Sequence, residues 1–416
     1  MGRRAFLGVG LAAALASGCA VDASVWDPVP ESAMPEPLDL VWPPDAPLPA
    51  EFDTPPWLTM PAPGMISVGW WTAAESTARV ELTQVDGAGG ASEVPILVEE
   101  TEPALLHHAL LGPLPAATGF HYRVTLDGSG AAREGVFRTP GSPSWRFIHL
   151  AELHAPSQAD RAARFADEIR AFQPDLAIES GDMVDDGDDP DGWRSYLRTS
   201  QPWISNVILL PAHSNHVNGF LGNQSLLGQF DLPGNGRWYA TRFGQVEIMT
   251  LDSTYDGESP DLGVELDWAD QQVVAARDGL GDPRFVIGAW HYPACSSHYP
   301  GRTGSRRWVI DQLLPAFAGA GGLDLILVGH DKYYERSLLE DGTGRQVVHV
   351  MANAGMLSPS DEGDGEPECS PQVTRTDTNS MVLVEVDDDR MEAQVIDPDG
   401  VEIDRFTIGG VETPGR

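Results

Sequence analysis

Side chains that can bind a metal follow five short apolar segments of the chain, each at the point where the segment ends. A single histidine in such a place is weak evidence, because most such histidines are hydrogen-bonded structural residues. Nitrogen and oxygen ligands that converge on one edge of a sheet are what a divalent metal site needs. We therefore expect a metal site. Its candidate residues are His154, Asp182, Asn215, His216, His291 and His330.

Short parallel strands are the elements that would position these side chains. Residues 147–151 and 176–178 are apolar and rich in β-forming residues, and apolar residues at helical spacing lie between them. This pattern predicts strand, helix, strand. In open α/β sheets, ligands bind beyond the carboxyl ends of neighbouring parallel strands. Further strands are predicted at 207–210, 246–251, 285–289 and 323–328, and helices at 264–278 and 305–318.

The chain changes its pattern near residue 143. Short alternating segments separated by turn residues predict a small all-β domain over residues 57–142. Within it, residues 114–124 are similar to the turn-and-strand signature of fibronectin type III-like domains, which implies packing rather than chemistry. An α/β domain is predicted over residues 143–410, and antiparallel pairs are expected among its last strands because they lie close in sequence. These strands are predicted at 347–352, 381–386, 393–396 and 403–408.

Residues 1–19 are typical of an export signal. Two arginines precede an apolar run, as in twin-arginine signals, and the last five residues resemble a bacterial lipobox that ends in Cys19. The alternative is a simple cleaved signal with a chance cysteine, because the lipobox leucine is one place early. We expect an exported bacterial lipoprotein, periplasmic or on the cell surface, with a lipid anchor at Cys19. Residues 20–56, rich in Pro and acidic residues, are predicted to be an extended linker.

The composition argues against some partners. The chain has 416 residues, of which 42% are hydrophobic, and a net charge of −36. The length predicts two or three domains, and the charge argues against nucleic acid or an anionic membrane, because both would repel the protein. In an exported protein Cys295 and Cys369 can form a disulfide, and the sequence leaves their pairing open. It leaves the oligomeric state open too.

From residue 145 to about 408 the chain resembles the calcineurin-like metallophosphoesterase fold. The β-domain in front, together with Trp238-Tyr239, 251–253 and 334–336, makes the purple acid phosphatase branch the nearest relative. The resemblance implies a β-sandwich with flanking helices that carries two metals. A water held by these metals is then expected to attack phosphorus.

The resemblance also implies that the second of the two metal sites is complete. His216 is expected to contact phosphate or to protonate the leaving oxygen, a role that suits imidazole. His298 lies where purple acid phosphatases place a histidine that contacts the substrate. The expected ligands of the second metal are Asp182, which bridges both metals, Asn215, His291 and His330.

The first metal site departs from the family pattern. Its expected positions hold Glu152, His154, Asp182 and Lys332, and Lys332 is the only lysine of the chain. We hypothesise that a Glu152–Lys332 ion pair replaces the first metal and leaves a single ion. The alternative is drift in a site that lost its function. Asp185 stands where the purple enzymes carry a metal-binding tyrosine, so we expect no tyrosinate colour.

Two classes of function are compatible with the sequence. The first is a metal-dependent phosphoesterase that hydrolyses small phosphate esters with one or two divalent ions, Zn, Mn or Fe. Its turnover is expected to be slow, and Lys332 would offset charge on the phosphoryl oxygens. The second is a catalytically impaired protein that keeps the fold as a surface binding module. A serine hydrolase is disfavoured, because the chain has no Gly-x-Ser-x-Gly elbow.

Overall fold

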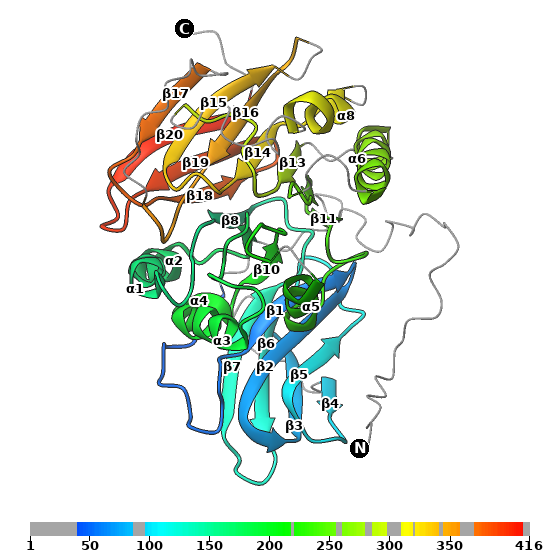
Figure 1. Cartoon of the computed structure of the whole chain (residues 1–416). Helices are drawn as coiled ribbons and strands as arrows, with labels where there is room; N and C mark the ends of the chain where they lie inside the picture. The colour runs from blue at the N-terminus through cyan, green and yellow to red at the C-terminus, as the bar shows by residue number, and fades with distance from the viewer. Residues whose placement is uncertain are drawn as a thin grey trace, which may run out of the picture.

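The computed structural model describes residues 40–85, 96–217, 220–254, 260–278, 285–297, 309–318, 321–340, 344–357 and 370–410. The strands of these residues form three sheets, of nine, seven and four strands. In Figure 1 the four-stranded sheet lies at the lower end of the molecule and the seven-stranded sheet at the upper end. The nine-stranded sheet extends from one end to the other.

The order of the strands across each sheet differs from their order along the chain. From one edge to the other, the nine-stranded sheet contains β20 (Glu402–Gly409), β19 (Arg390–Ile396), β18 (Met381–Val386), β8 (Trp145–Leu150), β9 (Leu176–Glu179), β10 (Ile208–Pro211), β1 (Trp57–Ala62), β2 (Met65–Ser76) and β5 (Ala104–Leu111). The seven-stranded sheet contains β11 (Tyr239–Phe243), β12 (Val246–Thr250), β13 (Phe285–Ala289), β14 (Leu325–Val328), β16 (Gln346–Met351), β15 (Tyr334–Glu340) and β17 (Ser370–Arg375). The four-stranded sheet contains β4 (Ile96–Glu99), β3 (Ala78–Val85), β6 (Gly119–Leu126) and β7 (Ala132–Arg138).

Helices cover the outer faces of the two larger sheets. The helices are α1 (Ala159–Ala162), α2 (Ala166–Phe172), α3 (Pro190–Thr199), α4 (Gln201–Ile204), α5 (Phe220–Gln229), α6 (Pro260–Asp278) and α8 (Leu314–Ala318). A 3-10 turn at Ala163–Phe165 joins α1 to α2, and a π-helical turn at Val309–Leu313 precedes α8.

The central strands are buried on both faces. Phe147 of β8 and Leu176 of β9 point into one core, which they share with Ile287 of the seven-stranded sheet. Their chain neighbours Ile148 and Ala177 point the other way, into a core shared with helices α2, α3 and α4. Because side chains alternate along a strand, burial on both faces requires an almost continuous apolar sequence. This arrangement confirms the predicted α/β architecture, a sandwich of sheets with flanking helices.

Parallel pairing brings the carboxyl ends of the central strands to one edge. Strand β9 pairs in parallel with both β8 and β10, and β13 and β14 are parallel neighbours in the other sheet. Beyond β8 and β9 the chain segments stay paired, because the amide of His154 donates to the carbonyl of Asp182 at 2.9 Å. The amide of Gly329, after β14, donates to the carbonyl of His291, after β13, at 3.1 Å. The loops that follow these strands therefore start from fixed positions.

The β-rich region before residue 143 is present, and its strands divide between two sheets. Strand β1 pairs in parallel with β10, where Leu58 lies opposite Ile208. Strands β1, β2 and β5 thereby extend the central sheet of the α/β region, and β3, β4, β6 and β7 form the four-stranded sheet. The hydroxyl of Tyr122 in β6 donates to the carbonyl of Ser205, after α4, at 2.8 Å. The change of sequence pattern near residue 143 is therefore not a break in the sheet.

The predicted linker is shorter than expected, because its last part packs on the protein. Trp42 is buried, and the guanidinium of Arg170 in α2 lies over its ring. Arg170 also donates to the carbonyl of Pro43 at 2.9 Å, and Asp53 forms an ion pair with Arg194 of α3 at 2.9 Å. The prediction of an extended linker is wrong for residues 40–56. Residues 20–39 lie outside the described part of the chain.

The remaining predictions on the fold have clear outcomes. Strands β18, β19 and β20 pair antiparallel, as expected from their closeness in sequence. Cys295 is disulfide-bonded, and Cys369, its predicted partner, lies outside the described residues. None of the helices in the described part of the chain combines the length and the apolar character that a membrane crossing needs.

Candidate metal centre

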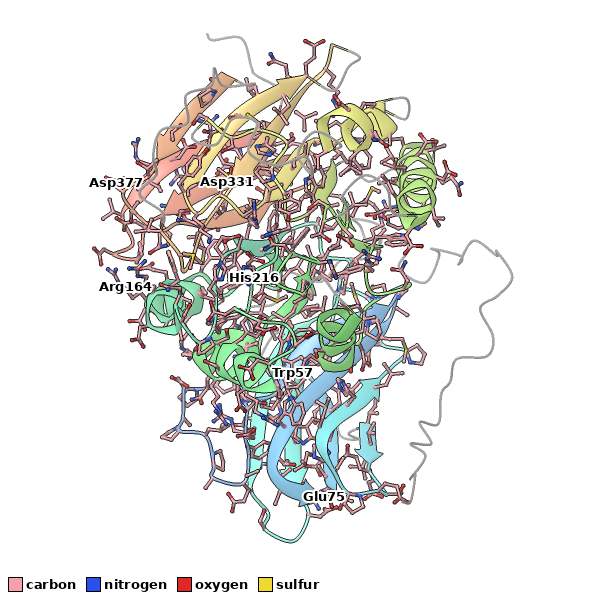
Figure 2. All side chains as sticks on the ribbon, viewed as in Figure 1. Trp57, Glu75, Arg164, His216, Asp331 and Asp377 are labelled. Atoms are coloured by element: carbon pink, nitrogen blue, oxygen red, sulfur yellow. The ribbon has the colours of Figure 1, made fainter. Side chains whose placement is uncertain are left out.

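The loops after five strands bring the predicted ligands together. Figure 2 places His216, which follows β10, near the middle of the molecule. Two groups of side chains have ligand atoms within 4.8 Å of one another, and Asp182 belongs to both groups. The first group is His154, Asp182 and His216, and the second is Asp182, His291 and His330. His298 lies outside the described residues, so its predicted contact with the substrate stays a prediction.

The second half-site consists of Asp182, Asn215, His291 and His330. Nε2 of His291 lies 2.7 Å from Oδ1 of Asn215, 3.2 Å from Nδ1 of His330 and 3.4 Å from Oδ1 of Asp182. All four predicted ligands therefore present a nitrogen or oxygen atom to one small volume. Oδ1 of Asp182 is buried and accepts no hydrogen bond from the described residues.

The ring of His291 is held in one orientation. Its Nδ1 lies 2.9 Å from the carbonyl oxygen of Ser180, which can only accept, so Nδ1 carries a proton and Nε2 faces the site. Burial would lower the pKa of His291, but the charge of Asp182, aided by Glu152, outweighs it and raises the pKa to about 9. The same attraction holds the pKa of Asp182 well below its usual range, although burial opposes it.

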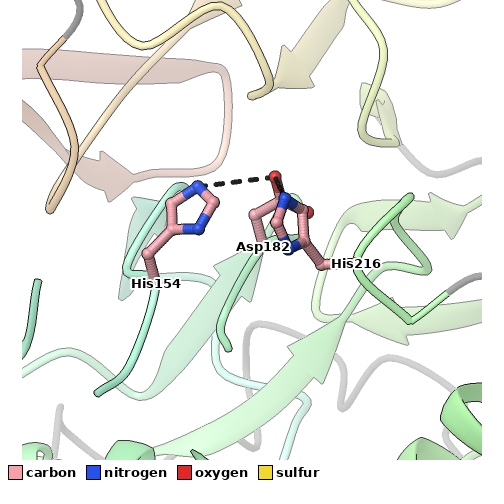
Figure 3. Close-up of side chains that lie close together, drawn as sticks. All are labelled: His154, Asp182 and His216. Atoms are coloured by element: carbon pink, nitrogen blue, oxygen red, sulfur yellow. Dashed lines mark ion pairs between the residues drawn. The ribbon is translucent and has the colours of Figure 1, made fainter. Parts of the chain in front are cut away.

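The first half-site consists of Glu152, His154, Asp182 and His216. Nε2 of His154 lies 2.9 Å from Oε2 of Glu152 and 3.5 Å from Oδ2 of Asp182. Nε2 of His216 lies 3.7 Å from the same Asp182 oxygen. Figure 3 marks both contacts of this oxygen with dashed lines. The two imidazole rings are perpendicular, with their centroids 4.8 Å apart. Burial would lower the pKa of His154, but the neighbouring carboxylates of Glu152 and Asp182 raise it.

Glu152 and Lys332 do not form the predicted ion pair. Oε2 of Glu152 lies against His154, and Oε1 accepts the backbone amide of His330. Among the described residues, Lys332 forms an ion pair with no carboxylate, although its charge lowers the pKa of His154. The hypothesis of an ion pair in place of the first metal is therefore wrong. The Glu152 carboxylate instead faces His154, one of the predicted metal ligands.

Backbone strain is concentrated in this centre. Seven non-glycine residues of the described chain have a positive φ, a conformation that costs on the order of 1 kcal/mol each. Five of them belong to the two half-sites or lie beside them, namely Glu152, His154, Asp182, His330 and Lys332, with φ between 46° and 75°. Strain of this kind persists where the surroundings impose it, and it clusters at functional sites. It argues against simple drift.

Sequence reasoning missed the contacts of Ser180, Asp185 and Ser157 that orient the ligands. The Oγ of Ser180 donates to the carbonyl of Leu327 at 3.0 Å, which fixes the segment whose carbonyl holds His291. The backbone carbonyl of Asp185 accepts a hydrogen bond from Nδ1 of His216. The carboxylate of Asp185 in turn accepts hydrogen bonds from the amide and the hydroxyl of Ser157, at 2.8 and 2.7 Å. These contacts join residues that are distant in sequence, so no short motif signals them.

The donor atoms suit a divalent metal. Imidazole nitrogens with carboxylate and amide oxygens are ligands of Zn, Mn and Fe. A buried carboxylate oxygen without a hydrogen-bond donor is costly unless an ion takes the donor's place. Oδ1 of Asp182 is such an oxygen among the described residues. The residues present therefore fit the cation that the sequence predicts.

The chain is similar to known proteins in sequence and in fold. Residues 146–334 match the family model described as calcineurin-like phosphoesterase. The chain is similar to the structure of purple acid phosphatase PPD1 from seeds of yellow lupin (Lupinus luteus), with a TM-score of 0.66 and 14% identity, over 85% of this chain and 74% of that one. It is also similar to a structure of PhoD, with a TM-score of 0.59 and 11% identity, over 89% and 95% of the two chains. At these identities the likeness shows the fold.

No curated protein sequence matches the chain at a significant level. The family model and the two structures nevertheless agree with the resemblance from which the roles of the site residues were predicted. The match of residues 146–334 to the calcineurin-like phosphoesterase family model thus confirms the resemblance predicted from the sequence.

Proposed function

We propose that the protein is a metal-dependent phosphoesterase that hydrolyses small phosphate esters. One observation carries this proposal: Asp182 directs Oδ1 to His291 and Oδ2 to His154, so that one buried carboxylate faces two groups of nitrogen and oxygen atoms. A divalent cation held there supplies Lewis acidity and an activated water as nucleophile. The family match of residues 146–334 supports the same reaction class.

The chain's own residues have distinct tasks in this reaction. Asp182, Asn215, His291 and His330 would hold the cation, because their donor atoms already converge. Lys332, which is partly exposed beside the first half-site, would offset the charge that develops on the phosphoryl oxygens. A positive charge that is already in place, such as the ammonium group of Lys332, stabilises the transition state without a rearrangement of the protein.

A phosphatase assay of the full chain tests the proposal. We expect release of phosphate from p-nitrophenyl phosphate after addition of Zn²⁺, Mn²⁺ or Fe²⁺ to the metal-free protein. His291→Ala should abolish it, because the second half-site loses its central donor. His121→Ala is a matched control, because that imidazole is partly exposed on β6 and pairs with Glu134 instead. Activity that survives His291→Ala would rule out the assigned chemistry.

A second candidate function is a surface binding module that has lost turnover. The observation in its favour is Lys332, which stands where the resemblance implies a histidine ligand. Isothermal titration with Zn²⁺ and then with inorganic phosphate separates the two functions. Binding of both ligands without hydrolysis of any of a panel of phosphate esters would favour the binding module.

We also propose that the protein is exported and anchored by a lipid at Cys19. The two arginines at positions 3 and 4, the apolar run and the small residues before Cys19 support this proposal. Labelled palmitate should be incorporated by a bacterial host that expresses the full chain, and Cys19→Ala should abolish the incorporation. Equal labelling of the variant would exclude the anchor.

A fibronectin type III-like identity of the N-terminal β-strands is a further part of the proposal. It is supported by the packing of β1, β2 and β5 on the four-stranded sheet, because these three strands share one core with β3, β6 and β7 and Val98 of β4 packs against it. Val68 of β2 and Tyr122 of β6 are both fully buried in this core. Sensitive sequence comparison of residues 57–142 alone against fibronectin type III domains would test the identity.

A further inference from the structure

We propose that the first half-site binds a second divalent cation through an altered ligand set, in which Nε2 of His216 takes the place of the ligand missing at Lys332. The other ligands are His154 and Asp182, and the Glu152 carboxylate lies against His154. The resemblance assigns His216 to phosphate contact or proton donation, and the geometry points to a different role. This inference rests on the proposed function, because the two cations would share Asp182.

The spacing of the donor atoms is close to that of a coordination shell. In a tetrahedral site with bonds of about 2.0–2.1 Å, neighbouring ligand atoms lie about 3.3–3.4 Å apart. Oδ2 of Asp182 lies 3.5 Å from Nε2 of His154 and 3.7 Å from Nε2 of His216. Small adjustments of the two imidazole rings would bring all three atoms to bonding distance of one ion.

The orientation of His216 fits a ligand. Its Nδ1 donates to the carbonyl of Asp185, so the neutral ring has its free lone pair on Nε2, which faces Asp182. Its backbone is held as well, because the amide of Gly187 donates to the His216 carbonyl at 2.8 Å. The perpendicular rings of His154 and His216 direct their Nε2 atoms to the same carboxylate oxygen (Figure 3).

The half-site has the negative charge that attracts a cation, and in the metal-free protein His154 and His291 lie against its two carboxylates. The side chains of Glu152 and Asp182 are 0% and 1% exposed. Buried carboxylates are stable only when they are paired or bound to a metal. Lys332 forms an ion pair with neither of them among the described residues, so it does not supply the counter-charge directly. The 29% exposure of His216 leaves one side of the half-site open to solvent, as a catalytic metal site needs.

This ligand role excludes proton donation by His216. Nε2 is the only nitrogen of this ring that faces the site, since Nδ1 is engaged by Asp185. A nitrogen that is bonded to a cation has no proton to give. The two roles therefore predict different metal contents for a variant that lacks this imidazole.

Metal content of the full chain tests the inference without reference to activity. Metal-free protein is titrated with Zn²⁺, and bound zinc is counted by mass spectrometry after gel filtration. We expect two ions for the wild type, one for His216→Ala and one for His291→Ala. His121→Ala and Lys332→Met should keep two. The second ion of His216→Ala should bind more than about 100-fold more weakly, beyond the 10–100-fold cost of losing a group that only orients a ligand.

A spectroscopic measurement distinguishes the loss of a metal ligand from a folding defect of the variant. With Co²⁺, two ions bridged by Asp182 should give a magnetically coupled signal in the wild type, which His216→Gln should convert to that of an isolated ion. The inference is overturned if the wild type binds one ion, or if both His216 variants retain two. No bound ion at all would instead overturn the proposed function, so the two failures are distinguishable.

Discussion

Nε2 of His291 lies 3.4 Å from Oδ1 of Asp182, and both side chains are buried. Burial by itself would raise the pKa of Asp182 and lower that of His291. The attraction between the two charges reverses both effects, so the pKa of Asp182 is lowered and that of His291 is raised to about 9. In the metal-free protein at neutral pH the two residues are therefore a buried ion pair.

Removal of His291 should destabilise the metal-free protein. His291→Ala leaves the Asp182 carboxylate buried without its partner, and breaking a buried pair in this way costs about 3–5 kcal/mol. The free energy of unfolding, measured in urea with a chelator present, should fall by this amount. His121→Ala, at a partly exposed position on β6, should change it by less than about 0.5 kcal/mol. Equal urea midpoints for His291→Ala and wild type would contradict the ion pair.

Gly181→Ala should disrupt the second half-site. Gly181 has a φ of +91°, and an added Cβ would lie 2.6 Å from Cβ of Ser214 and 2.7 Å from Nδ1 of His291. The clash should displace the His291 ring, so we expect loss of bound metal. Gly263→Ala in α6 is the matched control, because beyond its chain neighbours and the backbone of its own helix no atom of the described residues lies within 4 Å of the added Cβ. This control should stabilise the protein by about 0.5–1 kcal/mol, since alanine favours helix. Metal bound by Gly181→Ala at wild-type level would refute the prediction.

The sequence predicts the metal centre well where a ligand directly follows a buried strand. Asp182 and His291 are of this kind, because short apolar segments predict parallel strands and parallel strands align their carboxyl ends. The direction of a side chain beyond the strand end is set by local backbone angles. Glu152 and Lys332 both have positive φ, at 60° and 57°, which the sequence does not signal for these residue types. The predicted ion pair failed for this reason.

Long-range pairing also escapes sequence reasoning. The strand at Trp57–Ala62 pairs with β10, whose residues lie far along the chain, and no local pattern specifies that partner. Trp42 lies in a segment whose composition is typical of a linker, yet it is buried against α2 because Arg170 covers its ring. In both cases tertiary contacts, rather than local propensity, decide the structure.

Glu335 should anchor the loop that follows His291. Its carboxylate is fully buried in β15 and accepts from the amide of Ser297 at 3.1 Å and from the hydroxyls of Tyr333 and Ser337 at 3.3 and 3.0 Å. Glu335→Ala would remove the buried acceptor that these three groups share, so we expect a loss of about 2–4 kcal/mol in the free energy of unfolding.

Hydrogen exchange separates this anchoring role from a general loss of stability. In Glu335→Ala the amides of residues 294–297 should exchange faster than those of β13, which precedes them. Glu335→Gln keeps one acceptor oxygen and should have a smaller effect. Glu340→Ala, at an exposed position of the same strand, should leave exchange unchanged. Unaltered exchange at 294–297 in Glu335→Ala would show that the loop does not depend on this carboxylate.

Glu179 should make the stability of the protein depend on pH. This carboxyl is fully buried at the end of β9, where the hydroxyl of Tyr196 donates to both its oxygens at 2.8 Å. Burial raises its pKa to about 7, and the Tyr196 hydroxyl only partly opposes the rise. The folded protein thus holds this proton more tightly than the unfolded chain does. Stability is consequently lost as the pH rises from about 4.5 to about 7, by about 3 kcal/mol in total.

Glu179→Gln removes this loss, because an amide does not ionise. The variant should be more stable than the wild type at pH 8, by up to about 3 kcal/mol, and should lose that advantage at pH 5. Urea unfolding of the metal-free protein at both pH values measures the difference. Glu385→Gln, at an exposed carboxylate on β18, should follow the wild-type pH dependence. If Glu179→Gln follows it as well, the Glu179 carboxyl has an ordinary pKa in the folded protein, because a group with equal pKa values in both states adds no pH dependence.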